Sequence, residues 1–203
     1  GIGSDKRIGY SFIYPSVGYG GSCFPKDVHA ILDFASRKGY NPKILNSVNQ
    51  VNDNQKKYFF DKLLKRFKSL DGMRFGIWGL SFKPGTDDMR ESASIYFVEE
   101  LLKKGVSLQV YDPKAMDNAK KYYFKDLKNI TYCKNKIDVL NGINALILLT
   151  EWPEFRSLDF KKMNKLMKQK ILFDGRNQFD KYDMENNGIE YHQIGVRSLT
   201  KVN

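Results

Sequence analysis

The chain has 203 residues, of which 41% are hydrophobic and 28% charged, as in an ordinary globular protein. Nothing resembles a signal peptide and no apolar run is long enough to span a bilayer, so we expect a cytoplasmic protein without a membrane partner. The formal net charge of +11 would attract polyanions. However, the basic residues lie among helix-periodic apolar residues and form no nucleic-acid-binding motif, so no nucleic-acid partner is expected.

The first region, residues 1–71, combines a loop with two helices. Residues 1–25 are rich in Gly, Ser and Tyr and have no sustained periodicity, which indicates a structured loop. Pro25 suits a helix's first turn, and the glycine at position 39 suits its end, so a helix is predicted over 25–38. A longer helix is predicted over 42–68. Its expected apolar positions are Ile44, Leu45, Val48 and Val51 in the first half and Phe60, Leu63, Leu64 and Phe67 in the second. A lone helix of this length needs burial, so we expect this segment to form a homodimer.

After the Asp71-Gly72 boundary, strands and helices alternate along the chain. Strands are predicted at 73–78, 106–111, 130–133, 145–149, 170–173 and 189–193, and helices at 95–104, 114–122 and 158–167. Such alternation is typical of a parallel sheet with helices on both faces. The sequence therefore predicts an α/β fold in which a helical dimerisation segment precedes a doubly wound parallel sheet.

A glycine-rich segment ends in a cysteine at the start of the first predicted helix. Residues 18–27 read GYGGSCFPKD. The glycines permit close backbone approach, and exposed N–H groups at a helix start favour a thiolate at Cys23. Lys26 adds positive charge, and Asp27 supplies a carboxylate suited to orienting or deprotonating water. The alternative is a glycine loop that ends in a buried, inert cysteine.

The second cysteine has a different context. Cys133 has apolar and Lys neighbours and no glycine loop, which favours inert packing. Two free thiols in a reducing cytoplasm are expected rather than a disulfide. His29 and His192 are isolated and no metal-ligand spacing occurs, so no metal site is predicted.

Charged loops follow several predicted strands. Residues 76–92, GIWGLSFKPGTDDMRES, place Lys83 and Arg90 where each could pair with phosphate. The spacing departs from G-x-G-x-x-G and lacks a suitable third glycine, so an ordinary dinucleotide fingerprint is absent. Arg176 follows another predicted strand and would stand at the same edge of the sheet. The TEWP sequence at 150–153 lies there too; Glu151 and Trp152 could touch a base or ribose, although Trp152 fits a packing aromatic better.

Taken in this order, the segments resemble the UDP-glucose/GDP-mannose dehydrogenase family. The resemblance covers essentially the whole chain, through RIG at 7–9, GGSCFPKD at 20–27, FKPGTDDMRES at 82–92, TEW at 150–152 and DGRN at 174–177. It implies an N-terminal Rossmann domain, a helical connector that builds a dimer, and a second Rossmann-like domain. Residues 1–71 match the cysteine loop and connector, and residues 72–203 match the Rossmann-like domain that binds UDP-sugar.

The resemblance also implies a reaction. Family members oxidise the C6 alcohol of a nucleotide sugar to a carboxylate with two NAD. Cys23 matches the thiolate that attacks the aldehyde and becomes a thioester, and Asp27 matches the carboxylate that assists hydrolysis. Lys26 and Arg90 match contacts to NAD. Substrate contacts are implied at Arg7, Phe12, Ile13, Tyr14, Pro15, Ser16, Gly20, Lys83 and Arg176, of which Arg7 reaches a neighbouring subunit's site in some members.

The sequence Cys-Phe-Pro-Lys-Asp resembles the UDP-glucose branch, so UDP-glucose is the expected substrate and UDP-glucuronate the expected product. GDP-mannose and UDP-N-acetylmannosamine remain alternatives. The NAD-binding fingerprint, and a lysine and an asparagine expected at the substrate, are absent from the 203 residues. The other interpretation is therefore a nucleotide-sugar-binding and dimerisation fragment that has no activity of its own.

Overall fold

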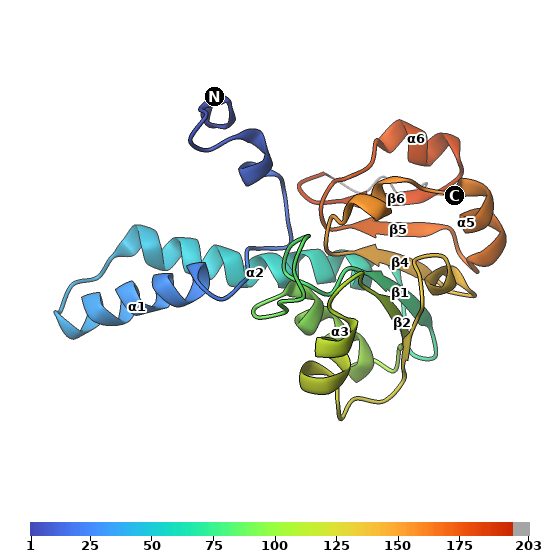
Figure 1. Cartoon of the computed structure of the whole chain (residues 1–203), viewed down its shortest axis with the longest axis horizontal. Helices are drawn as coiled ribbons and strands as arrows, with labels where there is room; N and C mark the ends of the chain where they lie inside the picture. The colour runs from blue at the N-terminus through green and yellow to red at the C-terminus, as the bar shows by residue number, and fades with distance from the viewer. Residues whose placement is uncertain (197–203) are drawn as a thin grey trace.

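The computed structural model describes residues 1–196, apart from the side chain of Ser11. Figure 1 shows an N-terminal arm, a projecting hairpin of two helices and a sheet flanked by shorter helices. The arm contains two 3-10 turns, η1 (Ile2–Ser4) and η2 (Tyr10–Ile13). The hairpin consists of α1 (Phe24–Arg37) and α2 (Lys43–Arg66).

The sheet has six parallel strands in the order β3-β2-β1-β4-β5-β6. The strands are β1 (Arg74–Trp78), β2 (Ser107–Tyr111), β3 (Ile130–Tyr132), β4 (Ala145–Leu148), β5 (Ile171–Asp174) and β6 (Glu190–Gln193). This is the Rossmann strand order, in which β2 and β3 are added on one side of β1 and β4, β5 and β6 on the other. The prediction of an α/β fold with a doubly wound parallel sheet is therefore confirmed.

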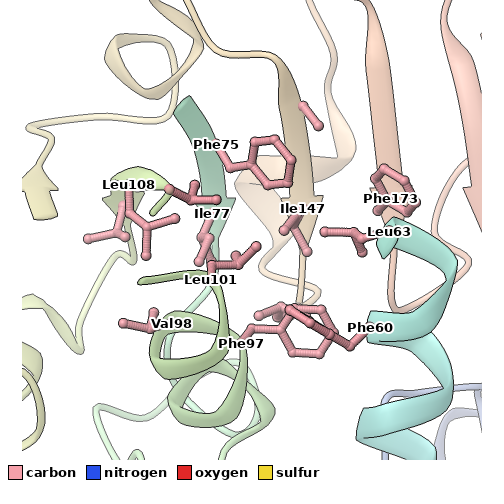
Figure 2. Close-up of a cluster of buried hydrophobic side chains, with 14 of the residues drawn as sticks. Phe60, Leu63, Phe75, Ile77, Phe97, Val98, Leu101, Leu108, Ile147 and Phe173 are labelled. Carbon is pink, nitrogen blue, oxygen red and sulfur yellow. The ribbon is translucent and has the colours of Figure 1, made fainter. Parts of the chain in front are cut away.

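Two apolar clusters cover the two faces of the sheet. On one face, α2 and α3 (Ala93–Lys103) pack against alternate strand residues; Figure 2 shows Phe60 and Leu63 of α2, Phe97 of α3, and Ile77 and Phe173 of the sheet. The other cluster takes residues from η4 (Asp138–Leu140), η5 (Pro153–Arg156), α5 (Phe160–Leu166) and α6 (Lys181–Asn186). All four residues of both β4 and β5 are buried, as expected for strands covered on both faces.

Two helical segments differ from the sequence prediction. The predicted helix over 114–122 is a single turn, α4 (Met116–Asn118), which continues as one π-helical turn, η3 (Ala119–Tyr123). The helix α6 was not predicted; it is short, and Asp180 caps it by accepting hydrogen bonds from the amides of Tyr182 and Asp183.

The two halves of α2 have different surroundings. Phe59, Phe60 and Leu63 are buried against the sheet, as predicted for the second half. In the first half, Ile44 and Val51 are 84% and 64% exposed, and Val48 is also exposed. The predicted inner face of the first half is therefore wrong for this chain by itself, because the hairpin projects beyond the edge of the sheet (Figure 1).

Candidate active site

Cys23 occupies the position predicted for a reactive thiol. It is the residue before α1, Pro25 lies in the first turn of that helix, and the Asp27 amide donates to the Cys23 carbonyl over 2.9 Å. The thiol is exposed and lies 3.6 Å from the Ser22 hydroxyl oxygen. Lys26 and Asp27 are also exposed, with 3.4 Å between the Lys26 ammonium nitrogen and the Asp27 carboxylate. The structure thus brings the thiol, a cation and a carboxylate to one helix start.

The glycines before Cys23 allow this loop to dock on the connection between β1 and α3. The Gly21 amide donates to the Arg90 carbonyl over 2.9 Å. A Cβ atom on Gly20 would lie only 2.4 Å from the Glu91 carbonyl oxygen. Glu91 itself has φ 54°, a conformation that a non-glycine residue rarely adopts. Only glycine therefore fits this contact, and the contact places Cys23 beside the sheet.

Two cations of the β1–α3 connection stand in solvent near this loop. Arg90 forms a bidentate ion pair with Asp88, at 2.7 Å for the shorter contact, and hydrogen bonds from Arg90 lower the pKa of the Asp88 carboxyl group. Lys83 is exposed, with its ammonium nitrogen 5.4 Å from the centre of the Phe82 ring. Both cations are accessible to an anionic ligand.

Asp112, directly after β2, holds neighbouring loops together. One carboxylate oxygen accepts from the Leu80 amide, from the amide and hydroxyl of Ser81, and from the Trp152 indole at 2.7–3.0 Å. The other accepts from the amides of Lys114 and Ala115. The side chain is 1% exposed. In a dinucleotide-binding Rossmann sheet, an acidic residue beyond the glycine turn binds the ribose, but this carboxylate has no free oxygen to offer. Trp152 is a buried packing residue, as predicted.

β5 ends at Asp174, and the chain turns tightly directly after it, at Gly175 and Arg176. The buried carboxylate of Asp174 accepts from the Arg176 and Gln178 amides and from the Tyr191 hydroxyl. Burial raises the pKa of Asp174. Asn177 has φ 47° and exchanges two hydrogen bonds with the backbone of Ile194. These contacts fix the backbone from which the Arg176 side chain extends.

Arg176 and Glu151 form a largely buried ion pair at the carboxyl edge of β4 and β5. The distance between Nη2 of Arg176 and Oε1 of Glu151 is 2.5 Å, and the side chains are 16% and 22% exposed. Oε2 of Glu151 and Nε of Arg176 are buried and have no hydrogen-bond partner among the described residues. Arg176 lines a small cavity together with Gly20, Ser81 and Phe82. A basic side chain and the cysteine loop therefore share one wall at the point where the strand order reverses.

The arm residues predicted to touch substrate lie elsewhere. Figure 1 shows residues 1–16 rising away from the sheet. Arg7 is exposed and paired with Asp5 at 2.8 Å. Phe12, Ile13, Tyr14 and Pro15 are exposed, and Ser16 is partly buried. Phe12 and Ser16 line a hollow of about 680 Å³ against the first half of α2. The structure does not bring these residues together with Lys83 and Arg176.

The second cysteine, which was expected to be inert, has the environment of an inert thiol. Cys133 is buried, and burial and the nearby charge of Asp138 raise the pKa of its thiol to about 11. Within residues 1–196, no cluster of His, Cys, Asp and Glu side chains is arranged to hold a metal ion. In the same range, no helix is both long and apolar enough to cross a membrane.

Comparisons with known proteins identify related sequences. The model of the UDP-glucose/GDP-mannose dehydrogenase family's UDP-binding domain matches residues 76–181, and that of its central domain matches residues 1–54. A UDP-glucose 6-dehydrogenase of Pseudomonas aeruginosa is 41% identical over 96% of this chain and 44% of its own length. A UDP-glucose 6-dehydrogenase of Bacillus subtilis is 35% identical over 98% of this chain and 44% of its own length. The chain thus spans less than half the length of these relatives.

A solved structure agrees with the sequence matches. The UDP-glucose dehydrogenase of Pyrobaculum islandicum superposes with a TM-score of 0.78 at 34% identity, over 94% of this chain and 41% of that protein. The similarity therefore includes both the helical hairpin region and the sheet.

Proposed function

The chain belongs to the UDP-glucose/GDP-mannose dehydrogenase family, and we propose that it supplies the nucleophilic cysteine and the nucleotide-sugar site of an NAD-dependent UDP-glucose 6-dehydrogenase. The proposed reaction oxidises UDP-glucose to UDP-glucuronate in two hydride transfers. The names of the relatives support this substrate. The observation that carries the proposal is the docking of the Cys23 loop on the carboxyl edge of the sheet, through the Gly21 amide and the Arg90 carbonyl.

In the proposed reaction Cys23 attacks the sugar aldehyde that the first oxidation produces. The Cys23 sulfur forms a bond to C6, and a thiohemiacetal results. A cofactor bound beside Lys26 and Arg90 would accept the second hydride from C6 while the thiohemiacetal hydroxyl gives its proton to water, which would leave a thioester; hydrolysis by water would then release the carboxylate and the free thiol. The exposed position of Cys23 before the first turn of α1 suits such a nucleophile, since the N–H groups at a helix start favour negative charge.

Asp27 is the proposed general base for thioester hydrolysis. It lies four residues after Cys23, and therefore on the same side of the helix start. Its carboxylate is exposed to water, as a general base for hydrolysis must be, and lies 3.4 Å from the Lys26 ammonium nitrogen. The same Lys26 gives the site a positive charge.

Arg176 and Lys83 are the proposed contacts to the nucleotide diphosphate. Both follow strands of the sheet, β5 and β1 respectively, and so lie at the edge where α/β folds bind ligands. Arg176 shares a cavity wall with Gly20 of the cysteine loop. A diphosphate held here would bring its sugar towards Cys23. Each charge-assisted hydrogen bond contributes about 1.5–3 kcal/mol.

NAD does not fit this sheet in the way that a dinucleotide fits a Rossmann sheet. The third glycine of the fingerprint is missing. Gly79 packs directly on Thr150, since a Cβ atom at Gly79 would lie only 2.4 Å from the Thr150 side chain, so this glycine leaves no space for a pyrophosphate. Asp112 is fully engaged by its neighbours. We therefore place the cofactor outside this sheet, with exposed Lys26 and Arg90 at its margin. When bound, NAD accepts the hydrides.

The hairpin is the proposed homodimer interface. Its exposed apolar side chains include Ile31 and Phe34 on α1 and Ile44, Val48 and Val51 on α2. Exposed apolar side chains concentrated on one pair of helices are typical of an interaction site. In such a dimer, Arg7 and the arm residues 12–16 would act at the partner's site. We assign the reaction to the cytoplasm because the mechanism needs Cys23 as a free thiol.

The assay that tests the proposal measures NADH formation by the whole protein with UDP-glucose, GDP-mannose and UDP-N-acetylmannosamine. We expect UDP-glucose to be oxidised fastest, to UDP-glucuronate. Cys23→Ser removes the nucleophile and should lower production of the acid by at least about 10³-fold. Undiminished acid formation by this variant would rule out the nucleophile. Faster oxidation of GDP-mannose would refute the substrate assignment.

A further inference from the structure

The backbone of the cysteine loop is held from two sides. On the side of the sheet, the Gly21 amide is bonded to Arg90 as described above. On the other side lies α2. Oδ1 of Asn52 accepts from the Tyr19 amide over 2.7 Å, and its amide nitrogen donates to the Tyr19 carbonyl over 3.2 Å. One amide side chain thus binds both polar backbone groups of a residue that lies 33 positions earlier.

Gln55 holds the beginning of the same loop. Its Nε2 atom donates to the Ser16 carbonyl over 3.1 Å. Lys56 is 15% exposed, and its ammonium nitrogen is 3.9 Å from the Glu91 carboxylate on the sheet side. Asn52, Gln55 and Lys56 are three and four positions apart, which places them on one face of α2. The three side chains form a polar stripe between the cysteine loop and the sheet.

This polar stripe is rigidly anchored. The next turn of α2 carries Phe59 and Phe60, which are 0% and 3% exposed and pack in the core cluster shown in Figure 2. Since a close-packed core fixes the helix relative to the sheet, the amides of Asn52 and Gln55 are fixed as well. The hydrogen bonds from Asn52 and Gln55 therefore hold the cysteine loop in a fixed position relative to the core.

The fit between Asn52 and the loop also requires glycine at position 18. Gly18 has φ 95°, and a Cβ atom there would lie 2.9 Å from Oδ1 of Asn52 and 3.2 Å from its carbonyl oxygen. The loop backbone therefore approaches α2 closely, although less closely than it approaches Glu91 on the opposite side. The glycines at 18, 20 and 21 serve two contacts, one with the helix and one with the sheet.

We propose that Asn52 and Gln55 are positioning residues that set the location of the Cys23 thiol relative to the nucleotide-sugar site. This inference rests on the proposed function of Cys23 as the nucleophile. Tyr19 is four residues before Cys23 in a short loop. The other support of this loop is the hydrogen bond of the Gly21 amide on the side of the sheet. Loss of the bonds to Tyr19 therefore loosens the segment that carries the thiol. A misplacement of about 1 Å in a reacting group can lower the rate about 10²-fold.

Kinetics of the whole protein test the proposal first. Asn52→Ala removes both bonds to Tyr19 and should lower kcat for UDP-glucuronate formation about 10- to 100-fold, while KM for UDP-glucose stays within about twofold. Gln55→Ala removes one bond and should have a smaller effect in the same direction. Asn54→Ala is the matched control, because Asn54 is exposed on the same helix turn. A raised KM with unchanged kcat would overturn the positioning role.

Amide hydrogen exchange gives a second readout that does not depend on catalysis. Asn52→Ala does not remove the hydrogen bond from the Gly21 amide to the Arg90 carbonyl. It does release the loop on the side of α2, so this hydrogen bond should open more often. We expect exchange of the Gly21 amide to accelerate about tenfold in Asn52→Ala and to be unchanged in Asn54→Ala, with the amides of β4 unaffected in both. If the protein oxidises no nucleotide sugar but Gly21 responds in this way, the proposed function is wrong while the positioning contact stands.

A conservative variant keeps the test decisive if Asn52→Ala does not fold. Asn52→Asp preserves the acceptor for the Tyr19 amide but turns a carboxylate oxygen towards the Tyr19 carbonyl. We expect Gly21 exchange and kcat between those of the native protein and those expected for Asn52→Ala. Native values for both quantities in this variant, with the folded state retained, would contradict the proposal.

Discussion

In the sheet region, residues 72–196, most large apolar side chains are buried or partly buried. Of the 18 large hydrophobic side chains that are exposed among residues 1–196, the first 71 residues contribute 14. The sheet closes its core on both faces by itself. In the hairpin, only the second half of α2 buries its apolar side chains, whereas apolar side chains of α1 and of the first half of α2 are exposed. The proposed dimer interface on the hairpin would account for this difference.

Polar residues follow the same division. Behind the sheet edge, Asp112 and Asp174 are buried and use their oxygens to hold loops. In the first region, Cys23, Lys26 and Asp27 are exposed. The two buried carboxylates of the sheet region thus hold the loops of the site, while the charged groups of the cysteine loop are free to act on a ligand.

The two cysteines give the largest expected contrast between the regions. At about pH 7.5, a thiol with the elevated pKa of Cys133, about 11, is ionised to less than about one part in 10³. Cys133 is also buried, whereas Cys23 is exposed. We expect iodoacetamide to alkylate Cys23 at least about 100-fold faster than Cys133, measured by mass spectrometry of the peptides. Equal rates in the folded protein would refute the distinction between an open and a closed region.

Charge placed on the open hairpin should break the proposed dimer. Val48 is 42% exposed in the single chain. In a dimer, Val48→Asp would bury an unpaired carboxylate, and we expect the dimer dissociation constant to rise about 50-fold or more. Sedimentation velocity across a concentration series measures this.

The control for the hairpin variant comes from the sheet region. Tyr122 is 65% exposed there, and Tyr122→Asp should leave the dissociation constant unchanged. If the native chain sediments only as a monomer at tens of micromolar, a range set by ordinary micromolar affinities, the exposed apolar side chains of the hairpin have a different partner.

An ion-pair cluster that joins the two regions should make a smaller contribution. Arg66 of α2 pairs with Glu190 of β6 at 2.5 Å, and Nε2 of His192 lies 2.7 Å from the same carboxylate. Burial opposes ionisation of Glu190, but the hydrogen bonds with His192 and Arg66 outweigh it and lower its pKa to about 2. Glu190→Gln should therefore reduce the free energy of unfolding by about 2 kcal/mol at neutral pH.

The pH dependence gives this prediction its sign. A carboxyl group whose folded pKa is depressed stabilises the protein above its unfolded pKa, which is near 4.5 for Glu190. This stabilisation is lost as the pH falls from about 4.5 towards 2, so the difference between native protein and Glu190→Gln should shrink there. Urea titrations at several pH values measure it. A difference that stays constant down to pH 3, about 1.5 units below that unfolded value, would contradict the assigned ionisation.

The sequence predicts the sheet region better than the hairpin because of how each is buried. The unbroken apolar run at 145–149 is a local signal, and β4 forms where expected, between neighbouring strands that bury it. The apolar side chains of Ile44 and Val48 carry the same periodic signal, but no surface within residues 1–196 covers them. Periodicity identifies an apolar face without identifying its partner.

The supporting residues of the site could not be found from local signals. Asp112 bonds with Leu80, Ser81 and Trp152, which lie 31 to 40 positions away. Asn52 reaches Tyr19 across 33 positions. Such contacts depend on the finished topology. The signal that was available is the glycine pattern at 18, 20 and 21, which predicted close approach but did not identify the elements approached.

The most direct test of the account is calorimetric titration of the 203-residue chain with UDP and with NAD. We predict measurable UDP binding, weakened about tenfold by Lys83→Ala and by Arg176→Ala through loss of one phosphate contact each. NAD should show no detectable binding at the same concentrations, because the sheet lacks the fingerprint and Asp112 is engaged. Tighter binding of NAD than of UDP would show that this sheet is the cofactor site, and would contradict the assignment of the chain to the nucleotide-sugar half.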